Sequence, residues 1–244
     1  MIEVPADLHI HTALSPCAAR EMTPPAIVRR ALECGLRLIA ICDHNSAGNA
    51  AAVQEAAAAD GPAVLAGLEI ATAEDVHVLG VFPDAARAGE AGAEIAATLP
   101  RVRPDRPAEQ WLLDAAGRQA GAEERMLAAS SGFALAAAVA LIRRHGGLAI
   151  ASHADRHSFS VTSQLGLWPE DVAFDAVEIS AAGVAAGRDR AFETLGLPLL
   201  TSSDSHFLSD IGSARTVMRM EGAPTWEELR RALGRALRRE THDA

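Results

Sequence analysis

Short apolar runs alternate along the chain with longer segments whose apolar residues recur every three or four positions. Runs of the first kind are typical of strands buried on both faces of a sheet, and the second pattern is typical of helices that pack one face against it. Besides a first short strand that begins at Ala6, the pattern predicts strands at 37–42, 62–68, 75–82, 148–152, 174–179, 197–202 and 216–220. It predicts helices at 23–34, 46–59, 133–145, 187–195 and 226–239.

This alternation of strands and helices with short connections predicts a parallel α/β sheet. About seven or eight strands favour a closed barrel over an open sheet. The stretch 83–132 interrupts the alternation, because prolines break its helical pieces. We interpret 83–132 as an irregular insertion within a single domain that spans 1–244.

Side chains that can bind metal follow most of the predicted strands. They are His9, His11, Asp43, His44, Glu69, His153, Asp204 and His206, whereas His77 lies near the start of its strand. Strand alternation directs His9 and His11 to the same side. In a parallel barrel these strand ends meet on one face, where acids and imidazoles repel or desolvate one another unless a cation compensates. Because one tetrahedral ion takes about four ligands, the set predicts two or three divalent ions, with Glu69 as a candidate bridge.

Some of these residues have simpler explanations. Asp43 could bind metal, support a ligand, or cap the helix that follows it. His77 could be a strand histidine without a metal. Cys42 is expected to lie in the core, because alternation points it away from Asp43. Glu178, near the end of a predicted strand, could reach the same face, but we favour a structural role for it.

The amino-acid composition argues against several classes of partner and of catalytic chemistry. The net charge of -10 argues against a general affinity for nucleic acid or anionic membranes. The chain contains no lysine, since all 22 basic residues are arginine, which excludes Schiff-base, phosphate-loop and carboxylated-lysine chemistry. The three cysteines form no regular framework, and no apolar run suggests a signal peptide or a membrane helix. We therefore expect a cytoplasmic protein with no membrane partner.

Taken in order, these motifs resemble the polymerase and histidinol phosphatase (PHP) superfamily. Relevant features are His-x-His near the start, Asp-His, a glutamate, two single histidines, and Asp-x-His near the end. The resemblance covers nearly the whole chain and implies a distorted (β/α)7 barrel, up to three divalent ions and the hydrolysis of phosphate esters. It implies three sets of ligands: His9, His11, Glu69 and Asp204 for one ion, Glu69, His77 and His153 for a second, and His44 and His206 for a third.

One position departs from the superfamily pattern. Many members place a further histidine eight residues after the first one, where this chain has Cys17. A thiolate can replace imidazole and would favour zinc, so we slightly favour Cys17 as a ligand of the third ion. The alternative is that Cys17 does not bind and the third site is weak or empty. We expect zinc, manganese or iron, with magnesium as the alternative.

The combined signals predict a metal-dependent phosphoesterase that resembles small stand-alone bacterial PHP proteins. Its substrate is expected to be a small phosphate ester, either a phosphomonoester or a nucleotide or short oligonucleotide. Two cations would clamp the phosphoryl oxygens and lower the pKa of a bridging water toward ~7. The predicted catalytic residues are Glu69, Asp204 and His206. The predicted substrate-binding residues are Arg156, Arg20 and His157, and each arginine could instead form a surface ion pair.

Other functions stay open. Amidohydrolases also begin with His-x-His, but they commonly bridge their metals with a modified lysine, which this chain lacks. A non-catalytic, metal-binding regulatory PHP module is a further alternative, although the proposed ligands are intact except at Cys17. A processive nuclease is disfavoured by the net charge of -10 and by the lack of an evident basic, aromatic-lined groove. We therefore expect no large nucleic-acid partner.

Overall fold

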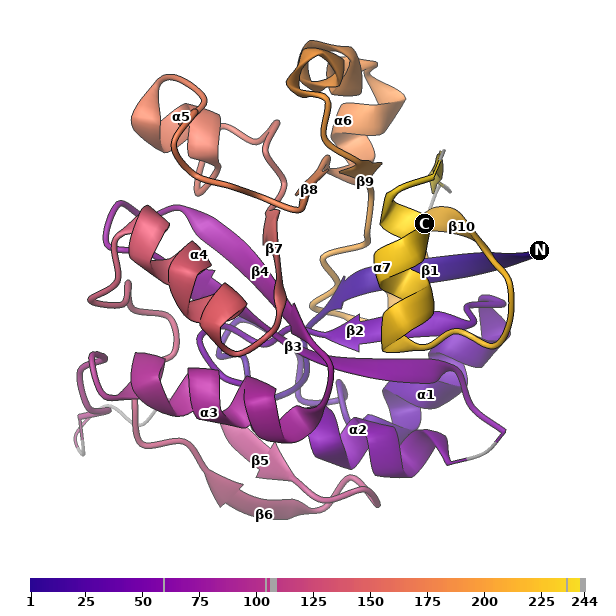
Figure 1. Cartoon of the computed structure of the whole chain (residues 1–244). Helices are drawn as coiled ribbons and strands as arrows, with labels where there is room; N and C mark the ends of the chain where they lie inside the picture. The colour runs from indigo at the N-terminus through magenta and orange to yellow at the C-terminus, as the bar shows by residue number, and fades with distance from the viewer. Residues whose placement is uncertain (59, 104, 106–108, 236, 242–244) are drawn as a thin grey trace.

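The computed structural model describes residues 1–58, 60–103, 105, 109–235 and 237–241. In this part of the chain one mixed sheet contains nine strands, in the order β11-β10-β1-β2-β3-β4-β7-β8-β9 (Figure 1). Their bounds are β1 (Ile2–Ile10), β2 (Leu38–Ile41), β3 (Ala63–Ala71), β4 (His77–Phe82), β7 (Leu148–Ala151), β8 (Ala176–Glu178), β9 (Leu199–Leu200), β10 (Ala214–Met220) and β11 (Arg238–Thr241).

Seven of the described strands, β1 to β4 and β7 to β9, form a nearly closed barrel. The pairs β1–β2, β2–β3, β7–β8 and β8–β9 are parallel. The seam between β9 and β1 is bridged by Ser205, which pairs with Ile10. There the His11 N–H donates to the Ser205 carbonyl at 3.0 Å, and the Ser205 N–H donates to the His9 carbonyl at 3.2 Å. The predicted distorted α/β barrel is confirmed.

One strand breaks the expected parallel arrangement. β4 is antiparallel to both β3 and β7. The connection from β3 is a tight turn in which the Thr72 N–H donates to the Val76 carbonyl at 2.9 Å, and such a turn can join only antiparallel strands. The reversal brings the first residue of β4, His77, to the face where the parallel strands end. The reversal explains why His77 lies at the start of its strand, whereas the other candidate ligands lie at strand ends.

Two apolar clusters hold the barrel together. The helices α1 (Pro24–Glu33), α2 (Ala50–Ala57), α3 (Ala85–Ala96) and α4 (Leu135–Arg144) pack outside the sheet (Figure 1), where their apolar faces share one cluster with Ile39 and Ile41. A second cluster combines inward-facing Leu38, Ala40 and Cys42 with residues of α7 (Trp226–Leu233). The alternation along β2 therefore places Cys42 in the core, as predicted.

The stretch 83–132, expected to be irregular, contains regular structure. α3 lies within it, and Asp84 caps this helix by accepting a hydrogen bond from the Arg87 N–H at 2.9 Å. A separate hairpin follows, formed by β5 (Trp111–Leu113) and β6 (Gln119–Ala122). It folds back onto the first histidine loop, because the Trp111 N–H donates to the Ala13 carbonyl at 2.9 Å.

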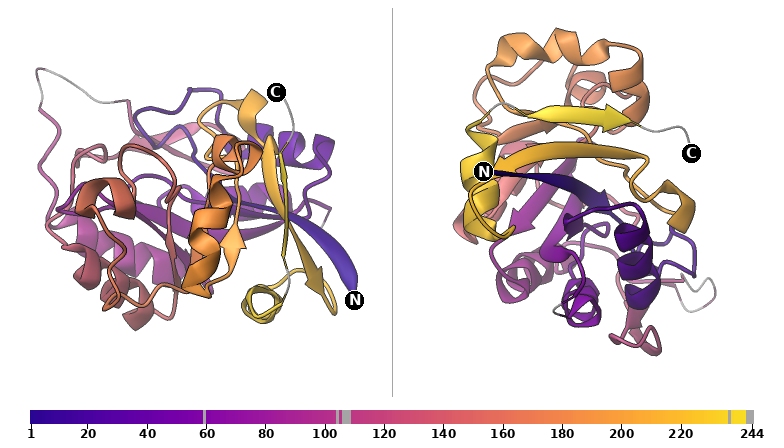
Figure 2. Two further views of the ribbon diagram at one scale, coloured as in Figure 1. Left: turned by 90° about the horizontal axis from the view of Figure 1, so that it is seen from above. Right: turned by 90° about the vertical axis from the view of Figure 1, so that its right-hand side faces the viewer.

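Several predicted boundaries differ from those observed. The helix expected from Ser46 begins at Ala50, and the helix expected over 226–239 ends at Leu233, after which the chain forms β11. β11 was not predicted because its residues are mostly charged. In the described sheet it is an edge strand that pairs only with β10, and β10 in turn pairs with β1 (Figure 2). The expected helix 187–195 is the 3₁₀ helix η1 (Arg188–Leu195), and three short helices were not predicted: α5 (Val161–Leu165), α6 (Ala181–Ala185) and η2 (Leu208–Asp210).

None of the helices in the described residues is both long and apolar enough to span a bilayer.

Candidate metal centre

The first strand delivers two histidines to the same point. The pairing of β1 with β2 is irregular between Asp7 and Ile10, so Leu8 packs in the interior cluster whereas Ile10 packs against the helices. His9 and His11 therefore both project away from the helix layer at the end of the strand. Their Nε2 atoms lie 3.1 Å apart, an arrangement that suits one shared cation.

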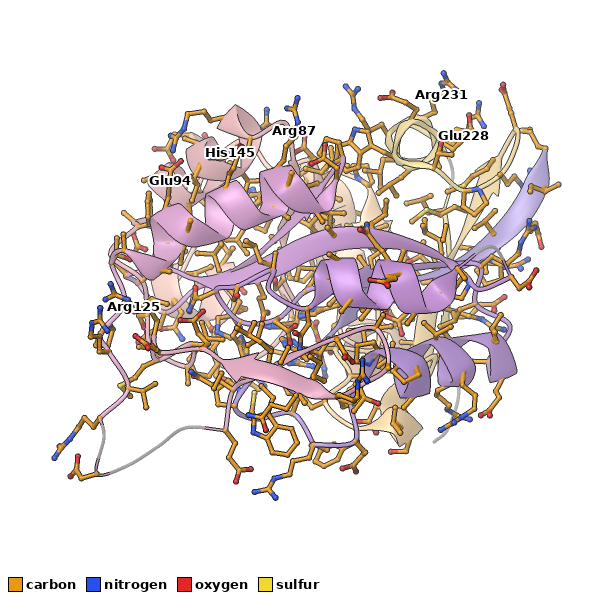
Figure 3. All side chains as sticks on the ribbon, turned by 90° about the horizontal axis from the view of Figure 1, so that it is seen from below. Arg87, Glu94, Arg125, His145, Glu228 and Arg231 are labelled. Carbon is orange, nitrogen blue, oxygen red and sulfur yellow. The ribbon has the colours of Figure 1, made fainter. Side chains whose placement is uncertain are left out.

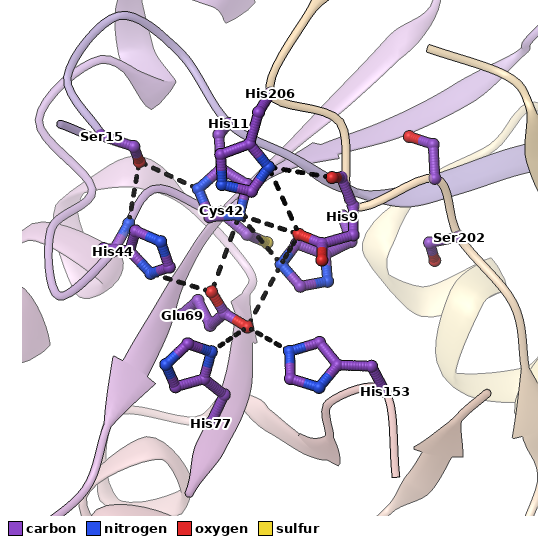
Figure 4. A network of polar contacts seen from close by, with 12 residues as sticks. His9, His11, Ser15, Cys42, His44, Glu69, His77, His153, Ser202 and His206 are labelled. Atoms are coloured by element: carbon purple, nitrogen blue, oxygen red, sulfur yellow. Dashed lines mark hydrogen bonds and ion pairs between the residues drawn. The ribbon is translucent and has the colours of Figure 1, made fainter. Parts of the chain in front are cut away.

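Glu69, at the end of β3, lies in the middle of five imidazole rings (Figure 4). Its Oε1 is 3.0 Å from His77 Nδ1, 3.2 Å from His153 Nε2 and 3.4 Å from His9 Nε2. Its Oε2 is 2.9 Å from His44 Nδ1 and 3.6 Å from His11 Nε2. Only about 1% of the Glu69 side chain is exposed, so its carboxylate can bridge two groups of ligands within a dry pocket.

Asp204 and His206 complete the cluster from the loop after β9. Asp204 Oδ1 lies 3.3 Å from His9 Nε2 and 3.2 Å from His11 Nε2. The His206 ring stacks on His11 with centroids 4.1 Å apart. His153 and Asp204 have positive φ angles of 29° and 51°, and such backbone strain is typical of functional sites, where the surrounding structure enforces it.

We call these side chains the histidine cluster: His9, His11, His44, Glu69, His77, His153, Asp204 and His206. Within the described residues, three groups each offer ligand atoms that lie within 4.8 Å of one another: His9, His11 and Asp204; His44, Glu69 and His77; and His11, His44 and His206. The groups overlap, which indicates a site for more than one ion. They differ from the expected sets in joining His44 to Glu69 and His77.

Cys17 lies beside the third group. Its thiol forms hydrogen bonds with the rings of His206 and His44. Burial alone would raise the pKa of this thiol, but the two histidines lower it to about 6. A thiolate is a soft potential donor for zinc, but Cys17 belongs to none of the three groups of ligand atoms found among the described residues. Its role as a ligand stays a prediction.

Asp43 supports the cluster without joining any of the three groups. Its Oδ1 accepts hydrogen bonds from the Thr12 N–H and the Ser15 hydroxyl, both at 2.7 Å, and its Oδ2 accepts one from the Thr12 hydroxyl at 2.8 Å. Ser15 Oγ in turn lies 2.9 Å from His11 Nδ1. Because both carboxylate oxygens are used in this way, Asp43 fixes the loop that orients His11. It caps no helix, since α2 begins only at Ala50.

Two buried acids outside the cluster hold its residues in place through hydrogen bonds. Glu178 Oε2 lies 3.0 Å from His9 Nδ1 and accepts a hydrogen bond from the His153 N–H at 3.1 Å. It therefore has a structural role that acts directly on two residues of the cluster. Asp7 accepts the N–H groups of Ser203 at 3.0 Å and Gly212 at 3.1 Å. Asp7 thus holds both ends of the loop that carries Asp204 and His206. The sequence showed an acid two residues before His9, but not that it binds this distant loop.

The electrostatics of the cluster favour cations. Burial alone would raise the pKa of Glu69, but the charges of His77 and His9 hold it well below its usual range. Burial likewise opposes ionisation of Asp204, whose pKa is also held low, mainly by His9. Burial would lower the pKa of His9, yet the nearby carboxylates, Asp204 first among them, raise it well above its usual value. Without metal, protons on imidazoles therefore compensate the buried carboxylates.

The three predicted substrate-binding residues lie in different environments. Arg156 Nη1 donates to Asp204 Oδ2 at 2.5 Å, so it contacts the cluster. Arg20 is exposed, pairs with Glu109 and stacks over Trp111 with 5.1 Å to the ring centroid. His157 is exposed, and among the described residues it forms no hydrogen bond, ion pair or ring contact with the histidine cluster. Only Arg156 therefore lies against the cluster.

Comparison with known proteins identifies the family. The family model described as the PHP domain matches residues 7–156, and the model described as PHP-associated matches residues 189–236. A search of curated proteins found no match.

Solved structures share the fold at low sequence identity. A lesion-specific endonuclease from Pyrococcus furiosus is 18% identical over 95% of this chain, with a TM-score of 0.71. The match spans only 56% of that endonuclease. A protein named as a metal-dependent phosphoesterase from Bifidobacterium adolescentis is 19% identical, covering 94% of this chain and 95% of that one, with a TM-score of 0.60. An amidohydrolase from Chromobacterium violaceum, with bound sulfate and no metal, is 20% identical, covering 93% and 96%, with a TM-score of 0.62.

At these identities the likeness to solved structures concerns the fold alone. The domain model, by contrast, matches more than half of the chain and includes His9, His11, Glu69 and His153. The protein belongs to the PHP domain family.

Proposed function

We propose that this protein hydrolyses small phosphate esters, using two or three divalent ions held by the histidine cluster. The observation that carries the proposal is the position of Glu69, a buried carboxylate shared by five histidines from β1, β4 and three loops. A neighbour of the same fold is named as a metal-dependent phosphoesterase. Substrates considered are phosphomonoesters, nucleotides and short oligonucleotides.

The residues present fit such ions. Imidazole nitrogens, carboxylate oxygens and the Cys17 thiol are the donors that zinc, manganese and iron accept. The Nε2 atoms of His9 and His11 lie 3.1 Å apart and face the same carboxylate oxygen of Asp204. When bound, divalent ions supply Lewis-acid stabilisation of phosphoryl charge and lower the pKa of water.

The chain's own residues supply the rest of the chemistry. Arg156 uses one nitrogen on Asp204, and its remaining donors can bind a phosphoryl oxygen. Burial would lower the pKa of His206, but hydrogen bonding to Cys17 and the charge of Asp204 raise it. Where no third ion is bound, His206 is therefore more readily protonated than an ordinary imidazole and can give a proton to the leaving oxygen.

The direct test combines metal analysis with a substrate screen. Purified protein should contain about two or three divalent ions per chain. With added manganese or zinc it should release phosphate from p-nitrophenyl phosphate. Bis(p-nitrophenyl) phosphate and a short oligonucleotide test the diesterase and nuclease variants, and hydrolysis of monoesters alone would exclude both. Bound metal without turnover of any ester would support the non-catalytic module instead.

Metal binding should release protons and tighten as pH rises. Burial alone would lower the pKa of His44, but hydrogen bonds to Cys17 and Glu69 raise it to about 10. Ligation requires the neutral ring, so metal must displace this proton at pH 7. Metal affinity should therefore rise by about tenfold per pH unit for each proton released between pH 6 and 8. Calorimetric titration in two buffers of different ionisation enthalpy measures the protons, and binding without proton release would contradict this assignment.

A further inference from the structure

A second pocket adjoins the histidine cluster. It lies between the loop after β7 and the helices α5 and η1, and has a volume of about 380 Å³, which is in the range of small-molecule sites. We call it the arginine pocket. Its lining residues are Asp155, Arg156, His157, Thr162, Ser163, Arg188, Ala191 and Phe192.

Arg156 belongs to both sites. Its guanidinium donates through Nη1 to Asp204 of the histidine cluster, and the same side chain lines the arginine pocket. Among the described residues, its Nε and Nη2 groups have no hydrogen-bond partner. Arg156 is therefore the side chain that links the histidine cluster to the arginine pocket.

Negative charge within the arginine pocket is neutralised by the fold. Asp155 Oδ1 accepts the Ser180 N–H at 2.7 Å, and its Oδ2 accepts the Ser180 hydroxyl at 2.8 Å. Oδ2 also accepts Arg188 Nε at 3.1 Å and Nη2 at 3.0 Å. Only about 1% of the Asp155 side chain is exposed, against 46% for Arg188. The carboxylate is therefore a buried anchor, and the exposed group is a guanidinium held in a fixed place.

The exposed donors of the arginine pocket are thus cationic or neutral. Arg188 retains Nη1, which has no partner among the described residues, and Arg156 retains Nε and Nη2. The exposed imidazole of His157 lies on the same lining. Such planar guanidinium donors bind phosphate and carboxylate groups. In a chain of net charge -10 this local arrangement selects for an anion.

We propose that the arginine pocket binds a second anionic group of the same substrate whose phosphate ester lies at the histidine cluster. This inference rests on the proposed function, and it identifies the substrate class as small phosphate esters that carry a further phosphate or carboxylate. Arg188 and His157 contact this second anion, while Arg156 lies between the two sites. Ala191 and Phe192 contact the carbon skeleton that joins the two groups.

Matched pairs of substrates test the proposal with the metal-loaded protein. For the carboxylate arm, 3-phosphoglycerate is compared with glycerol 3-phosphate. For the phosphate arm, 1,3-propanediol bisphosphate is compared with 3-hydroxypropyl phosphate. In at least one pair we expect kcat/KM to favour the second anion by about tenfold or more, as a guanidinium–anion contact would give, and the arm that shows this preference identifies the anion.

Variants locate the preference in the arginine pocket. Arg188→Gln keeps a hydrogen-bond donor for Asp155 but removes the charge, so the preference should fall about tenfold, and His157→Ala should also reduce it. Arg190→Ala is the matched control, because Arg190 is exposed on the same 3₁₀ helix but does not line the pocket. Equal kcat/KM within both wild-type pairs, or a preference unchanged in Arg188→Gln, would overturn the proposal.

Equilibrium binding separates this proposal from the proposed function. Calorimetric titration of the same pairs measures recognition of the second anion whether or not the ester is cleaved. Tighter binding of the doubly anionic ester, lost in Arg188→Gln, supports the arginine pocket even if p-nitrophenyl phosphate is not hydrolysed, in which case only the proposed function fails. Equal binding within both pairs overturns the pocket assignment even if hydrolysis of p-nitrophenyl phosphate is robust.

Discussion

Replacing Glu69 with glutamine should remove most bound metal and reduce phosphoesterase kcat/KM by about 10³-fold or more. The Glu69 carboxylate lies within 3.6 Å of five histidine nitrogens and links the groups of ligands. Glutamine has almost the same size but no charge, so it cannot compensate two cations. Elemental mass spectrometry measures the metal content, and initial rates with p-nitrophenyl phosphate measure the activity.

A matched acid serves as the control. Glu94 is an exposed glutamate of α3 that pairs with Arg144 and His145 (Figure 3). Glu94→Gln should retain wild-type metal content and rate, and its unfolding free energy should change by no more than about 0.5 kcal/mol. Wild-type metal content in Glu69→Gln would contradict the assignment of Glu69 as the bridging ligand.

His9→Ala should lose metal and at least ~10²-fold in activity while the chain keeps its fold. His9 is fully buried, with Nδ1 held by Glu178 and Nε2 facing His11 and Asp204. Truncation leaves a cavity and removes one of the two hydrogen-bond partners of Glu178 Oε2, which keeps the His153 N–H. The unfolding free energy should therefore fall by about 2 kcal/mol. Chemical denaturation, circular dichroism and metal content separate this loss of stability from the loss of the site.

His145→Ala controls for histidine removal as such. His145 precedes β7, whereas His153 of the cluster follows the same strand. The His145 Nε2 lies 2.8 Å from Glu94 Oε1 beside α3 (Figure 3). We expect its metal content and rate to equal those of the wild type. Full metal content and activity in His9→Ala would refute the metal assignment, even if His145→Ala behaved as expected.

Local sequence patterns predicted most of the strands because buried strands are short apolar runs, and β2 and β7 are of that kind. The patterns failed where a tertiary contact decides the local structure. β11 is charged, and it forms only because β10 offers a free edge. α3 was included in the predicted insertion, because prolines interrupt the helical pieces of 83–132. The burial of Ala88, Ala91 and Ile95 shows that α3 packs on the core.

Some residues of the candidate site were predicted from local sequence patterns, and the surroundings of others are known only from the structure. His9, His11, Glu69, His153, Asp204 and His206 were identified from strand ends, since a parallel barrel gathers those ends on one face whatever its details. The role of Asp43 was left open among three alternatives. Its hydrogen bonds to Thr12 and Ser15 support the loop that carries His11, and its role as a metal ligand stays a prediction. Arg20 pairs with Glu109, a residue distant in sequence, which agrees with the surface ion pair that was its stated alternative. Its role in substrate binding stays a prediction.

By itself, the sequence determined the α/β barrel class, the family and the cluster residues that follow parallel strands, because strand alternation and the order of motifs can be read along the chain. Only the tertiary structure decided that β4 runs antiparallel and so brings His77 to the cluster. It alone showed that Asp7 and Glu178 support the cluster and that Arg188 lines a second pocket beside it. These features depend on pairs of residues far apart in the chain, and a hydrogen bond between such residues leaves no periodic trace in the sequence.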